Sequence, residues 1–427
     1  MTCALLPYTG TEASRQRARF PLRVLCTIIM ALFIAFPGRG ASQQNGPAEL
    51  VELVESVPEE TVLDHASIRN TTVVWIEMLR AAHHSIDIEQ FYIANTPDGA
   101  LEPVIREVEA AAARGVKVRV IAEKKFTSTY PETLERFRGA PGAEVRILDI
   151  AAILGDGVQH AKYFVVDDVD VFVGSQNWDW RALSHINELG LRVRDSVTAA
   201  AFVHLFAFDW ALAGGMEMQQ ARQLAGSMPT AFPHILDCES GTHALTPVFS
   251  PRPLLPDGAR WDGTALAALL DGARDSLKLQ VLSYGSYPLL EDALLRAAAR
   301  GVRVSLLVSD WSLSSSKQKD LKRLQRTPGV TVKFTAIPAH SSGFISFARV
   351  EHCKYLLVDA DRAWVGTNNW SPDYFLFSRN AGFIMQSPSL CALLQQKYAM
   401  SWDGPYATTI NPDTTYTARK RDDGDGK

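Results

Sequence analysis

The sequence predicts an α/β protein with two pseudo-symmetric lobes, each a mixed β-sheet flanked by helices, and one active site at the seam between them. The main observation is an internal repeat. Residues 110–120 read AAAARGVKVRV and residues 297–304 read AAARGVRV, in each case a helix end, a glycine and an alternating strand. Four pairs of matching segments are separated by 191, 186, 192 and 192 residues, so the chain contains two copies of one unit.

Strand-like and helix-like patterns alternate within each copy, which favours a parallel or mixed sheet covered on both faces. The stretch 229–255 is rich in Pro, Gly and Ser and is the expected linker region. We therefore expect a signal peptide or signal anchor over 1–40, a first lobe over 41–245 and a second lobe over 246–407. Residues 408–427 are polar and charged, which predicts a disordered tail.

The first 40 residues have the pattern of an export signal. Four arginines between positions 15 and 23 precede an apolar run over 24–36, and small residues follow. This run is short for a membrane span, which needs about 20 residues, and suits the core of a signal peptide. We expect the chain to be secreted, periplasmic or luminal, with an uncleaved type II membrane anchor as the alternative.

The composition is that of a globular protein, with 47% hydrophobic and 21% charged residues, and excludes a disordered or fibrous chain. Beyond residue 40, 38 basic and 46 acidic residues give a net charge of −8. A broad basic face is not expected, so any nucleic acid must bind in a local groove. Cys238, Cys353 and Cys391 permit at most one internal disulfide and show no zinc-type spacing.

A motif of six positions occurs twice with identical spacing. Its residues are His160, Lys162, Asp167, Gly174, Ser175 and Asn177 in the first copy, and His352, Lys354, Asp359, Gly366, Thr367 and Asn369 in the second. A single histidine–lysine pair is more often part of an ordinary surface strand. At average composition the full pattern would arise by chance about once in 10 million positions, so its duplication indicates function.

Two histidines, two lysines and two asparagines at one spot can bind and cleave a phosphodiester. The lysines and asparagines can hold the non-bridging oxygens and stabilise the charge of the transition state. One neutral histidine can attack phosphorus, and the other, protonated, can donate to the leaving oxygen. Since the lysines supply the positive charge, we expect neither a metal nor a cofactor. The residues expected to bind the substrate are Asn177, Asn369, Ser175 and Thr367.

The spacing also predicts how the motif is arranged. His160 and Lys162 are two residues apart on a predicted strand, which places both on one face, about 6.6 Å apart. Asp167 has an odd offset, so we interpret Asp167 and Asp359, although part of the catalytic motif, as turn or supporting residues. Glu188 is a candidate acceptor for the second ring nitrogen of His160.

The doubled HxKxxxxDxxxxxxGSxN pattern resembles the defining motif of the phospholipase D superfamily, and the resemblance covers nearly all of residues 50–407. It implies two lobes that share one site, a phosphohistidine on His160 and a general acid at His352. The family's glutamate corresponds to Glu188. The equivalent position of the second lobe is Asn380, so the partner of His352 is left open, and Thr367 keeps the hydroxyl of the family's serine.

Segments around the motifs resemble one branch of that superfamily, the animal phospholipase D paralogues three and four. They are NWDWR at 177–181, ELG at 188–190, GTNNWS at 366–371 and WDGPY at 402–406. The resemblance implies an exported or anchored five-prime exonuclease acting on single-stranded DNA or RNA.

Two other functions stay open. The first is hydrolysis of phospholipids or transfer of the phosphatidyl group, since the same phosphohistidine serves either reaction. The second is a non-catalytic phosphate-binding module. Trp178, Trp180 and Trp370 could stack on bases or pack in the core. Five other histidines are expected to be structural or surface residues: His83, His84, His185, His204 and His340.

Overall fold

The computed structural model describes residues 49–314 and 316–422, and the predicted signal segment lies outside them. An eight-stranded sheet has the order β2-β1-β10-β8-β7-β3-β5-β6, and a nine-stranded sheet has the order β11-β12-β18-β17-β16-β13-β14-β15-β19. The strands of the first are β1 (Val51–Ser56), β2 (Arg69–Asn70), β3 (Ser85–Gln90), β5 (Lys117–Glu123), β6 (Ala143–Leu148), β7 (Tyr163–Val166), β8 (Asp170–Gly174) and β10 (Glu188–Arg194). Those of the second are β11 (His234–Cys238), β12 (Gly241–Ser250), β13 (Ser276–Val281), β14 (Arg303–Ser309), β15 (Val330–Thr335), β16 (Tyr355–Val358), β17 (Arg362–Gly366), β18 (Asn380–Gln386) and β19 (Ala407–Thr409).

The two sheets have the same topology, which confirms the internal repeat. The run β1-β10-β8-β7-β3-β5-β6 corresponds strand for strand to β12-β18-β17-β16-β13-β14-β15. Both sheets are mixed, because β3, β5 and β6 are parallel to one another, as are β13, β14 and β15, while the motif strands β7 and β16 pair antiparallel. A separate pair of short strands, β4 (Ile93–Ala94) and β9 (Trp178–Asp179), completes the first lobe.

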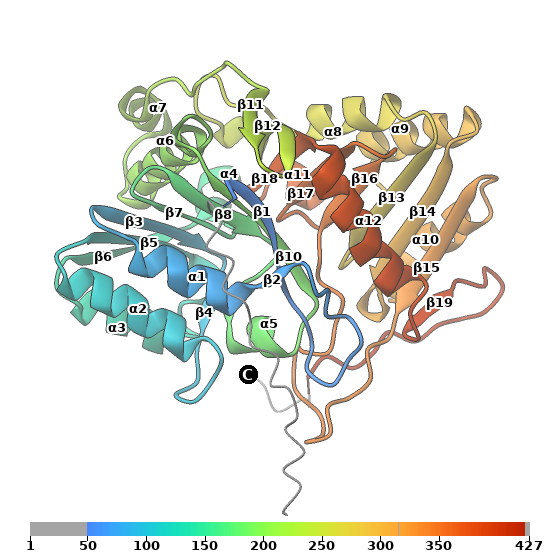
Figure 1. Cartoon of the computed structure of the whole chain (residues 1–427), viewed down its shortest axis with the longest axis horizontal. Helices are drawn as coiled ribbons and strands as arrows, with labels where there is room; N and C mark the ends of the chain where they lie inside the picture. Colours follow the sequence, from blue (N-terminus) through green and yellow to red (C-terminus); the bar gives the residue numbers. More distant parts are fainter. Residues whose placement is uncertain (1–48, 315, 423–427) are drawn as a thin grey trace, which may run out of the picture. The chain divides into compact units, whose positions relative to one another are not determined.

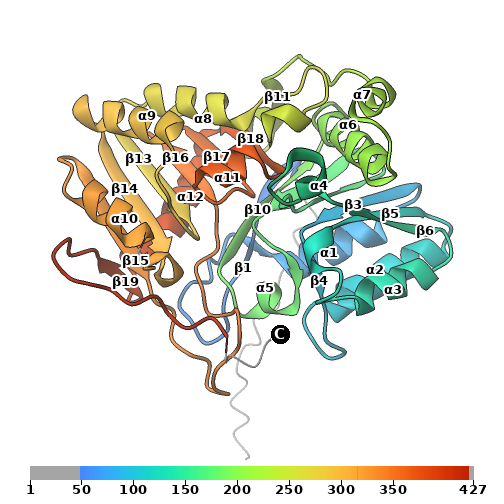
Figure 2. The same cartoon turned by 180° about the vertical axis from the view of Figure 1, so that it is seen from behind.

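Helices flank each sheet in the repeated order (Figure 1). In the first lobe they are α1 (Thr71–Arg80), α2 (Glu102–Ala113), α3 (Glu132–Gly139), α4 (Ile150–Leu154), α5 (Trp180–Ser184), α6 (Ser196–Ala213) and α7 (Met218–Ala225). In the second they are α8 (Asp262–Asp271), α9 (Pro288–Ala299), α10 (Lys317–Gln325), α11 (Pro372–Leu376) and α12 (Pro388–Trp402). Figure 2 shows the other side, where α4 of the first lobe lies near α11 of the second.

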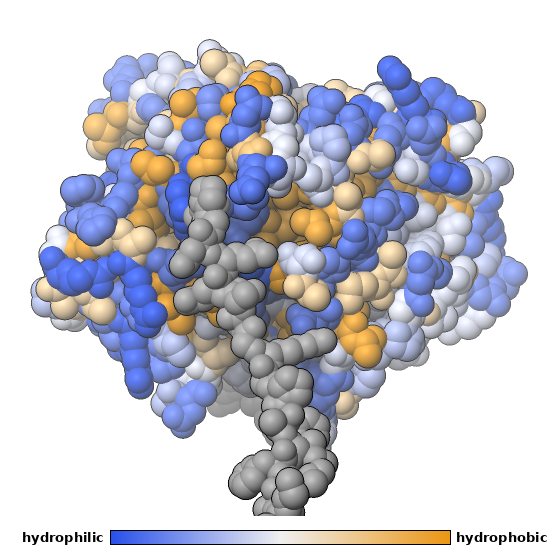
Figure 3. Space-filling view, in the orientation of Figure 1, coloured by the Kyte–Doolittle hydropathy of each residue, from blue (hydrophilic) through white to orange (hydrophobic). Residues whose placement is uncertain are grey.

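Three apolar cores hold these layers together. One lies on the α1–α3 side of the first sheet, and one on the α8–α10 side of the second. The largest joins the lobes, since α6 and α12 contribute to it together with strands of both sheets. On the face drawn in Figure 3, hydrophilic side chains dominate the outer helices of both lobes. The motif strands β7 and β16 border this shared core, so the packing that joins the lobes also fixes the motifs.

Two expected boundaries need correction. The division expected at 245/246 falls inside β12, which pairs with β18 of the second sheet, so the second sheet begins with β11 within the expected linker. The expected tail is ordered over 408–422. β19 pairs with β15, Ile410 is buried, and Arg419 donates to the carbonyl oxygens of Ile337 and Arg349. Residues 423–427 lie outside the described part of the chain.

Among the described residues, one helix is long and apolar enough to cross a membrane. It is α6, and 56% of that segment is buried within the protein. Phe202, Leu205 and Phe206 of this helix belong to the core shared by the lobes. Its apolar character is explained by this packing, because a helix that is hydrophobic all round is typical of a buried position in a large core.

Candidate active site

The two motif segments lie immediately before β7 and β16. β7 begins at Tyr163 and β16 at Tyr355, so each histidine–lysine pair precedes its strand and does not lie within it. Ala161 and Cys353, between the members of each pair, are fully buried, as expected for side chains packed into the protein. Gly174 is paired with Gly190, and an added Cβ at Gly174 would lie 2.6 Å from the Gly190 Cα. The glycine of the motif therefore serves strand packing.

Each motif segment pairs with a segment of the other lobe. The His160 amide donates to the Arg379 carbonyl oxygen (2.9 Å), and the Arg379 amide donates to that of Val158 (2.9 Å). In the same way, the His352 amide donates to the Asn187 carbonyl oxygen (2.9 Å) and the Asn187 amide to that of Val350 (3.0 Å). The short bridges Gln159–Arg379 and Asn187–Glu351 are both parallel. Two equivalent crossings thus place both motifs at the seam.

As a result, the partners of the two histidines come from the opposite lobes. Glu188, at the start of β10, has both carboxylate oxygens 2.8 Å from His352 Nδ1. Asn380, at the start of β18, has its Oδ1 2.9 Å from His160 Nδ1. The expectation that Glu188 holds His160 is therefore wrong. It failed because the 185–188 segment pairs with residues 349–352, a contact that spacing along one lobe cannot reveal.

The contacts of Asn380 determine which nitrogen of His160 carries the proton. The Asn380 Nδ2 donates to the carbonyl oxygens of Tyr374 (2.7 Å) and Ser378 (3.3 Å), which turns Oδ1 toward the histidine. The Thr367 hydroxyl donates to the same Oδ1 (2.8 Å). Since Oδ1 only accepts, His160 Nδ1 must be the N–H donor, and its Nε2 keeps a free lone pair.

Two buried lysines supply positive charge. The Lys162 and Lys354 ammonium groups donate to the carbonyl oxygens of His160 (2.6 Å) and His352 (2.7 Å). Burial lowers the pKa of Lys162 well below its usual value and that of Lys354 to about 8. Burial and then the lysine charges lower the pKa of both histidines well below the usual range, whereas burial raises the pKa of Glu188 to about 7. Burial in this site disfavours every charge, and an incoming phosphodiester anion is the group that would stabilise the cations.

The side-chain oxygens of the two motif asparagines are unpaired among the described residues, whereas the hydroxyls of Ser175 and Thr367 are bonded within the protein. Asn177 and Asn369 each have a buried Oδ1 with no hydrogen-bond partner among the described residues. The Ser175 hydroxyl, by contrast, donates to the Leu189 carbonyl oxygen and accepts from the Leu189 amide. Thr367 is likewise bound to Asn380. Ser175 and Thr367, expected to bind substrate, instead fasten the strands that carry Glu188 and Asn380.

The aspartates of the motif are turn residues, as interpreted, and not catalytic ones. Asp167 follows the far end of β7 with a φ of 53°, and Asp359 follows β16 with a φ of 58°. The Asp167 carboxylate accepts from the backbone amides of residues 83–85, and that of Asp359 from those of residues 274–276. Each aspartate thus fastens the loop that leads into β3 or β13, the strand that pairs antiparallel with its motif strand.

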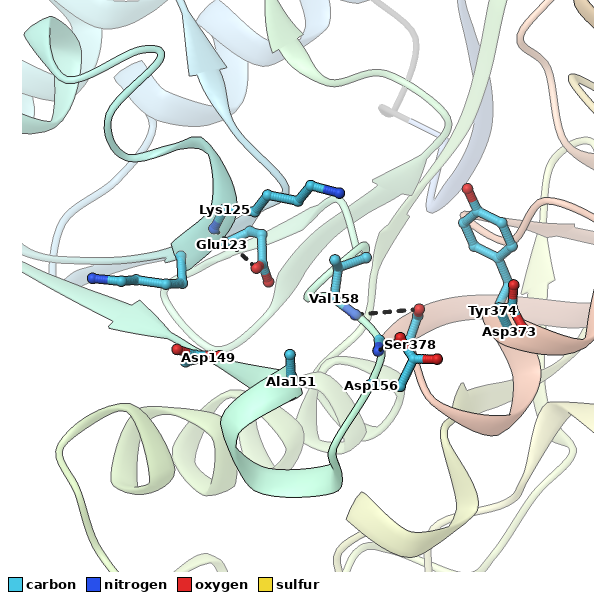
Figure 4. A pocket seen from close by; sticks show the side chains of 11 residues that line it. Glu123, Lys125, Asp149, Ala151, Asp156, Val158, Asp373, Tyr374 and Ser378 are labelled. Atoms are coloured by element: carbon cyan, nitrogen blue, oxygen red, sulfur yellow. Dashed lines mark hydrogen bonds between the residues drawn. The ribbon is translucent and has the colours of Figure 1, made fainter.

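A pocket of about 420 Å³ opens next to His160 and is lined by both lobes (Figure 4). Lys124 and Lys125 line it from the first lobe and Tyr374 from the second, and the Tyr374 ring lies 4.8 Å from that of His160. Several acidic side chains line the same pocket, namely Glu123, Asp149, Asp156 and Asp373. The only hydrogen bond across the pocket drawn in the figure joins the Val158 amide to the Ser378 hydroxyl (3.3 Å).

Phe91 contacts His160 and belongs to a group of four aromatic rings. The Phe91 ring lies 4.9 Å from the His160 ring and 4.7 Å from that of Phe126. Tyr92 lies 5.2 Å from both Phe126 and Tyr130, and the Phe126 and Tyr130 planes differ by 17°. All four rings are half-buried. We call Phe91, Tyr92, Phe126 and Tyr130 the aromatic cluster.

Comparison with known proteins identifies the family. The model of the cardiolipin synthase PLD-like domain matches twice, over residues 75–210 and 266–402. The 5'-3' exonuclease PLD3 of Macaca fascicularis is 31% identical, with 94% of this chain and 91% of that protein covered. The chain belongs to the phospholipase D superfamily. It is a phosphodiesterase of that superfamily, and the two family matches coincide with the two lobes of the fold.

Other members of the superfamily resemble the chain over most of its length. Phospholipase D Z of Dictyostelium discoideum is 28% identical over 88% of this chain and 93% of its own. The crystal structure of phosphatidylserine synthase from Haemophilus influenzae has the same fold, with a TM-score of 0.63 and 13% identity over 85% of this chain and 88% of that one. This phospholipase D fold thus appears in relatives named for nucleic-acid and for lipid substrates.

Sequence reasoning missed the aromatic cluster of this superfamily member. Trp178, Trp180 and Trp370 attracted attention because they adjoin the motifs, but Trp178 and Trp370 are buried in the cores. The useful signal was the pair Phe91–Tyr92 directly after β3, the strand that pairs with the motif strand β7. A half-buried aromatic pair at the end of β3 lies close to the start of the neighbouring strand β7, which the motif histidine and lysine precede.

Proposed function

We propose that this phosphodiesterase removes nucleotides from the five-prime end of single-stranded nucleic acid through a phosphohistidine on His160. The observation that supports a single-stranded nucleic acid as the substrate is the aromatic cluster beside His160. Sequence-tolerant binding of single strands combines a cationic path with aromatic faces on which bases stack. Lys162 and Lys354 supply the cations at the site itself, since four acidic side chains accompany Lys124 and Lys125 in the adjoining pocket. The five-prime direction is supported by the names of the exonuclease relatives.

His160 is the nucleophile in this proposal because its Nε2 lone pair is free and its ring is neutral. Attack by Nε2 forms a P–N bond as the bond from phosphorus to the leaving oxygen breaks. Lys162, Lys354 and the Nδ2 donors of the motif asparagines stabilise the extra negative charge on the non-bridging oxygens. Asn380 keeps Nδ1 protonated and adds no charge, so the lone pair is not lost to protonation before the attack.

His352 is the proton carrier because it alone faces a carboxylate. Glu188 stabilises the His352 imidazolium, whose Nε2 proton passes to the leaving oxygen as the P–O bond breaks. The neutral His352 then takes a proton from water, the resulting hydroxide attacks phosphorus, and the P–N bond to His160 breaks. Both histidines return to their starting protonation states.

Phospholipid cleavage or phosphatidyl transfer is the second candidate, favoured by the relative named phospholipase D Z. The shared phosphohistidine would react with water or with an alcohol.

We also propose that the chain is exported, with the segment over 1–40 as a cleaved signal or as a type II anchor that associates it with a membrane.

The deciding experiment compares a single-stranded oligonucleotide with phosphatidylcholine micelles, using the whole exported chain. We expect stepwise release from a free five-prime end and no cleavage of circular single-stranded DNA. Phe126→Ala should raise KM for the oligonucleotide about 10-fold, since loss of one stacked base costs about 1–3 kcal/mol, and leave a small p-nitrophenyl phosphodiester unaffected. Phe344→Ala, at an exposed phenylalanine outside the cluster, is the matched control. Faster cleavage of the phospholipid, or no effect of Phe126→Ala, would contradict the proposal.

A further inference from the structure

A second group of ligand-type side chains lies away from the catalytic histidines. Glu59, His185 and His340 each place a ligand atom within 4.8 Å of those of the other two. His340 Nε2 is 3.7 Å from Glu59 Oε2 and 3.3 Å from Glu60 Oε1. These residues come from three separate segments, of which the last belongs to the second lobe. We call Glu59, Glu60, His185 and His340 the histidine–glutamate cluster.

His185 has an unpaired nitrogen in this cluster. The residue is 8% exposed, and its Nδ1 is buried with no hydrogen-bond partner among the described residues. A buried polar atom without a partner is unfavourable and calls for an explanation.

His340 directs its Nε2 at the carboxylates of the cluster. Its Nδ1 lies 2.7 Å from the Ser342 hydroxyl and accepts from the Ser342 amide (3.2 Å), so the neutral ring carries its proton on Nε2 in this arrangement. An ion bound at Nε2 would require the other tautomer, in which Nδ1–H donates to the Ser342 hydroxyl oxygen, as metal-binding histidines usually donate from their second ring nitrogen. The His185 and His340 rings lie 5.1 Å apart and tilted by 70°, so neither stacks on the other.

A simple ion pair explains only part of this arrangement. A protonated His340 could pair with Glu59 and Glu60, but the unpaired nitrogen of His185 would be left unexplained. The nearby cation, Arg349, does not fill the gap. Its guanidinium donates to the carbonyl oxygens of Pro338 (2.7 Å) and Glu59 (2.6 Å), and within the described part of the chain it forms no ion pair with a carboxylate of the cluster.

We propose that the histidine–glutamate cluster binds one Zn²⁺, with His185, His340 and the Glu59 carboxylate as ligands. Two imidazoles and a carboxylate are a donor set that zinc accepts, at bond lengths of about 2.0–2.2 Å. Separations of up to 4.8 Å are wider than tetrahedral zinc needs, so the three ligands must close on the ion by roughly 1 Å, and the exposed Glu59 side chain is the one freest to move. A pocket of about 660 Å³, lined in part by Glu59 and His185, gives the ion access from solvent.

The position of this site suggests its role. His185 begins the segment that pairs with residues 349–352, since the Arg349 amide donates to the His185 carbonyl oxygen (2.8 Å). The other end of the same pairing carries Glu188 and His352. An ion bound by His185 and by His340 of the second lobe would therefore fix the register of the two segments. Zinc here is structural, and the chemistry at His160 does not pass through it.

The test measures zinc binding to the whole exported chain. We expect the metal-stripped protein to take up one equivalent of Zn²⁺ by calorimetry and elemental analysis, with a rise in Tm. Co²⁺ in its place should give the intense visible absorption of a four-coordinate site. His340→Ala should abolish both uptake and the rise in Tm, and Glu59→Gln should weaken binding at least 10-fold.

His234→Ala is the matched control, because His234 also faces a carboxylate, Asp195 at 3.4 Å, but belongs to no such ligand group among the described residues. It should bind zinc like the parent protein. If His340→Ala fails to fold by circular dichroism, His340→Asn keeps a polar side chain and serves instead. No zinc uptake by the parent protein, or equal uptake by the folded His340 variant, would overturn the proposal.

Discussion

Replacing the buried carboxylate that faces His352 should stabilise the protein at alkaline pH. Burial raises the pKa of Glu188 to about 7 from an ordinary value of 4.5. One pKa unit corresponds to about 1.36 kcal/mol, so ionising Glu188 at pH 8 costs the folded state about 3 kcal/mol. Because the folded-state pKa is the higher one, this contribution to stability is fully present below pH 4.5. It is lost as the pH rises to about 7 and stays constant above.

Glu188→Gln removes the ionisation and keeps an oxygen acceptor for His352. The free energy of unfolding of the variant should exceed that of the parent protein by about 3 kcal/mol at pH 8 and match it near pH 4. Urea unfolding at both pH values and one ionic strength measures the difference. Glu239→Gln, at an exposed carboxylate, is the control and should show no such dependence on pH. If the difference in free energy of unfolding between Glu188→Gln and the parent protein does not grow from pH 4 to pH 8, the reasoning is refuted.

The same variant should lose activity while it gains stability. A neutral amide stabilises the His352 imidazolium less than a carboxylate does, so we expect kcat to fall on the order of 10²-fold. The two measurements together distinguish a catalytic carboxylate from a merely structural one. A structural role would not move stability and turnover in opposite directions.

Four further predictions follow from the site. Lys162→Met and Lys354→Met should each lower turnover on the order of 10²-fold or more without unfolding the protein, and near-normal turnover in either would show that the lobes do not share one site. With a p-nitrophenyl phosphodiester, His352→Ala should release a burst of nitrophenol and then stall, whereas His160→Ala should give neither a burst nor labelled protein; the reverse pattern would exchange their roles. EDTA should leave the initial rate unchanged well below Tm, and loss of rate that a divalent ion restores would contradict this. Asn380→Asp should slow formation of the phosphohistidine at least 10-fold by stopped-flow measurement with the same substrate, because a carboxylate favours protonation of His160, and an unchanged rate would contradict this role of a neutral partner.

The sequence predicted the features that are repeated at a fixed spacing. The doubled motif and the matching segments are local patterns, so they specified two mixed sheets of equal topology and brought both histidines to one seam. The wrong prediction of a disordered tail also has a local cause. The segment beyond residue 407 is polar overall, yet a few side chains, such as Ile410, attach it to the second lobe. Average composition does not detect such isolated anchors.

Contacts between the lobes could not be read from spacing. Glu188 lies 28 residues after His160 and 164 before His352, yet the fold places it against the latter. The pairing depends on the parallel bridge between Asn187 and Glu351, which two separately folded lobes would not form. The histidine–glutamate cluster escaped notice for the same reason, since Glu59, His185 and His340 share no short motif.

The difference between Glu188 and Asn380 at equivalent positions has a consequence for charge at the seam. A five-coordinate phosphorus carries about two negative charges, and Glu188 adds a third. Lys162, Lys354 and a protonated His352 supply three positive charges, and the His160 ring carries a fourth once its Nε2 is bonded to phosphorus. Most of the charge in the transition state is thus compensated, which lowers its cost in a buried site. A carboxylate at Asn380 would favour protonation of His160, the ring that must attack. Asparagine keeps the hydrogen bond to Nδ1 without this effect. In the proposed mechanism, one difference between symmetric positions thus breaks the symmetry of the site, with attack in the first lobe and proton transfer in the second.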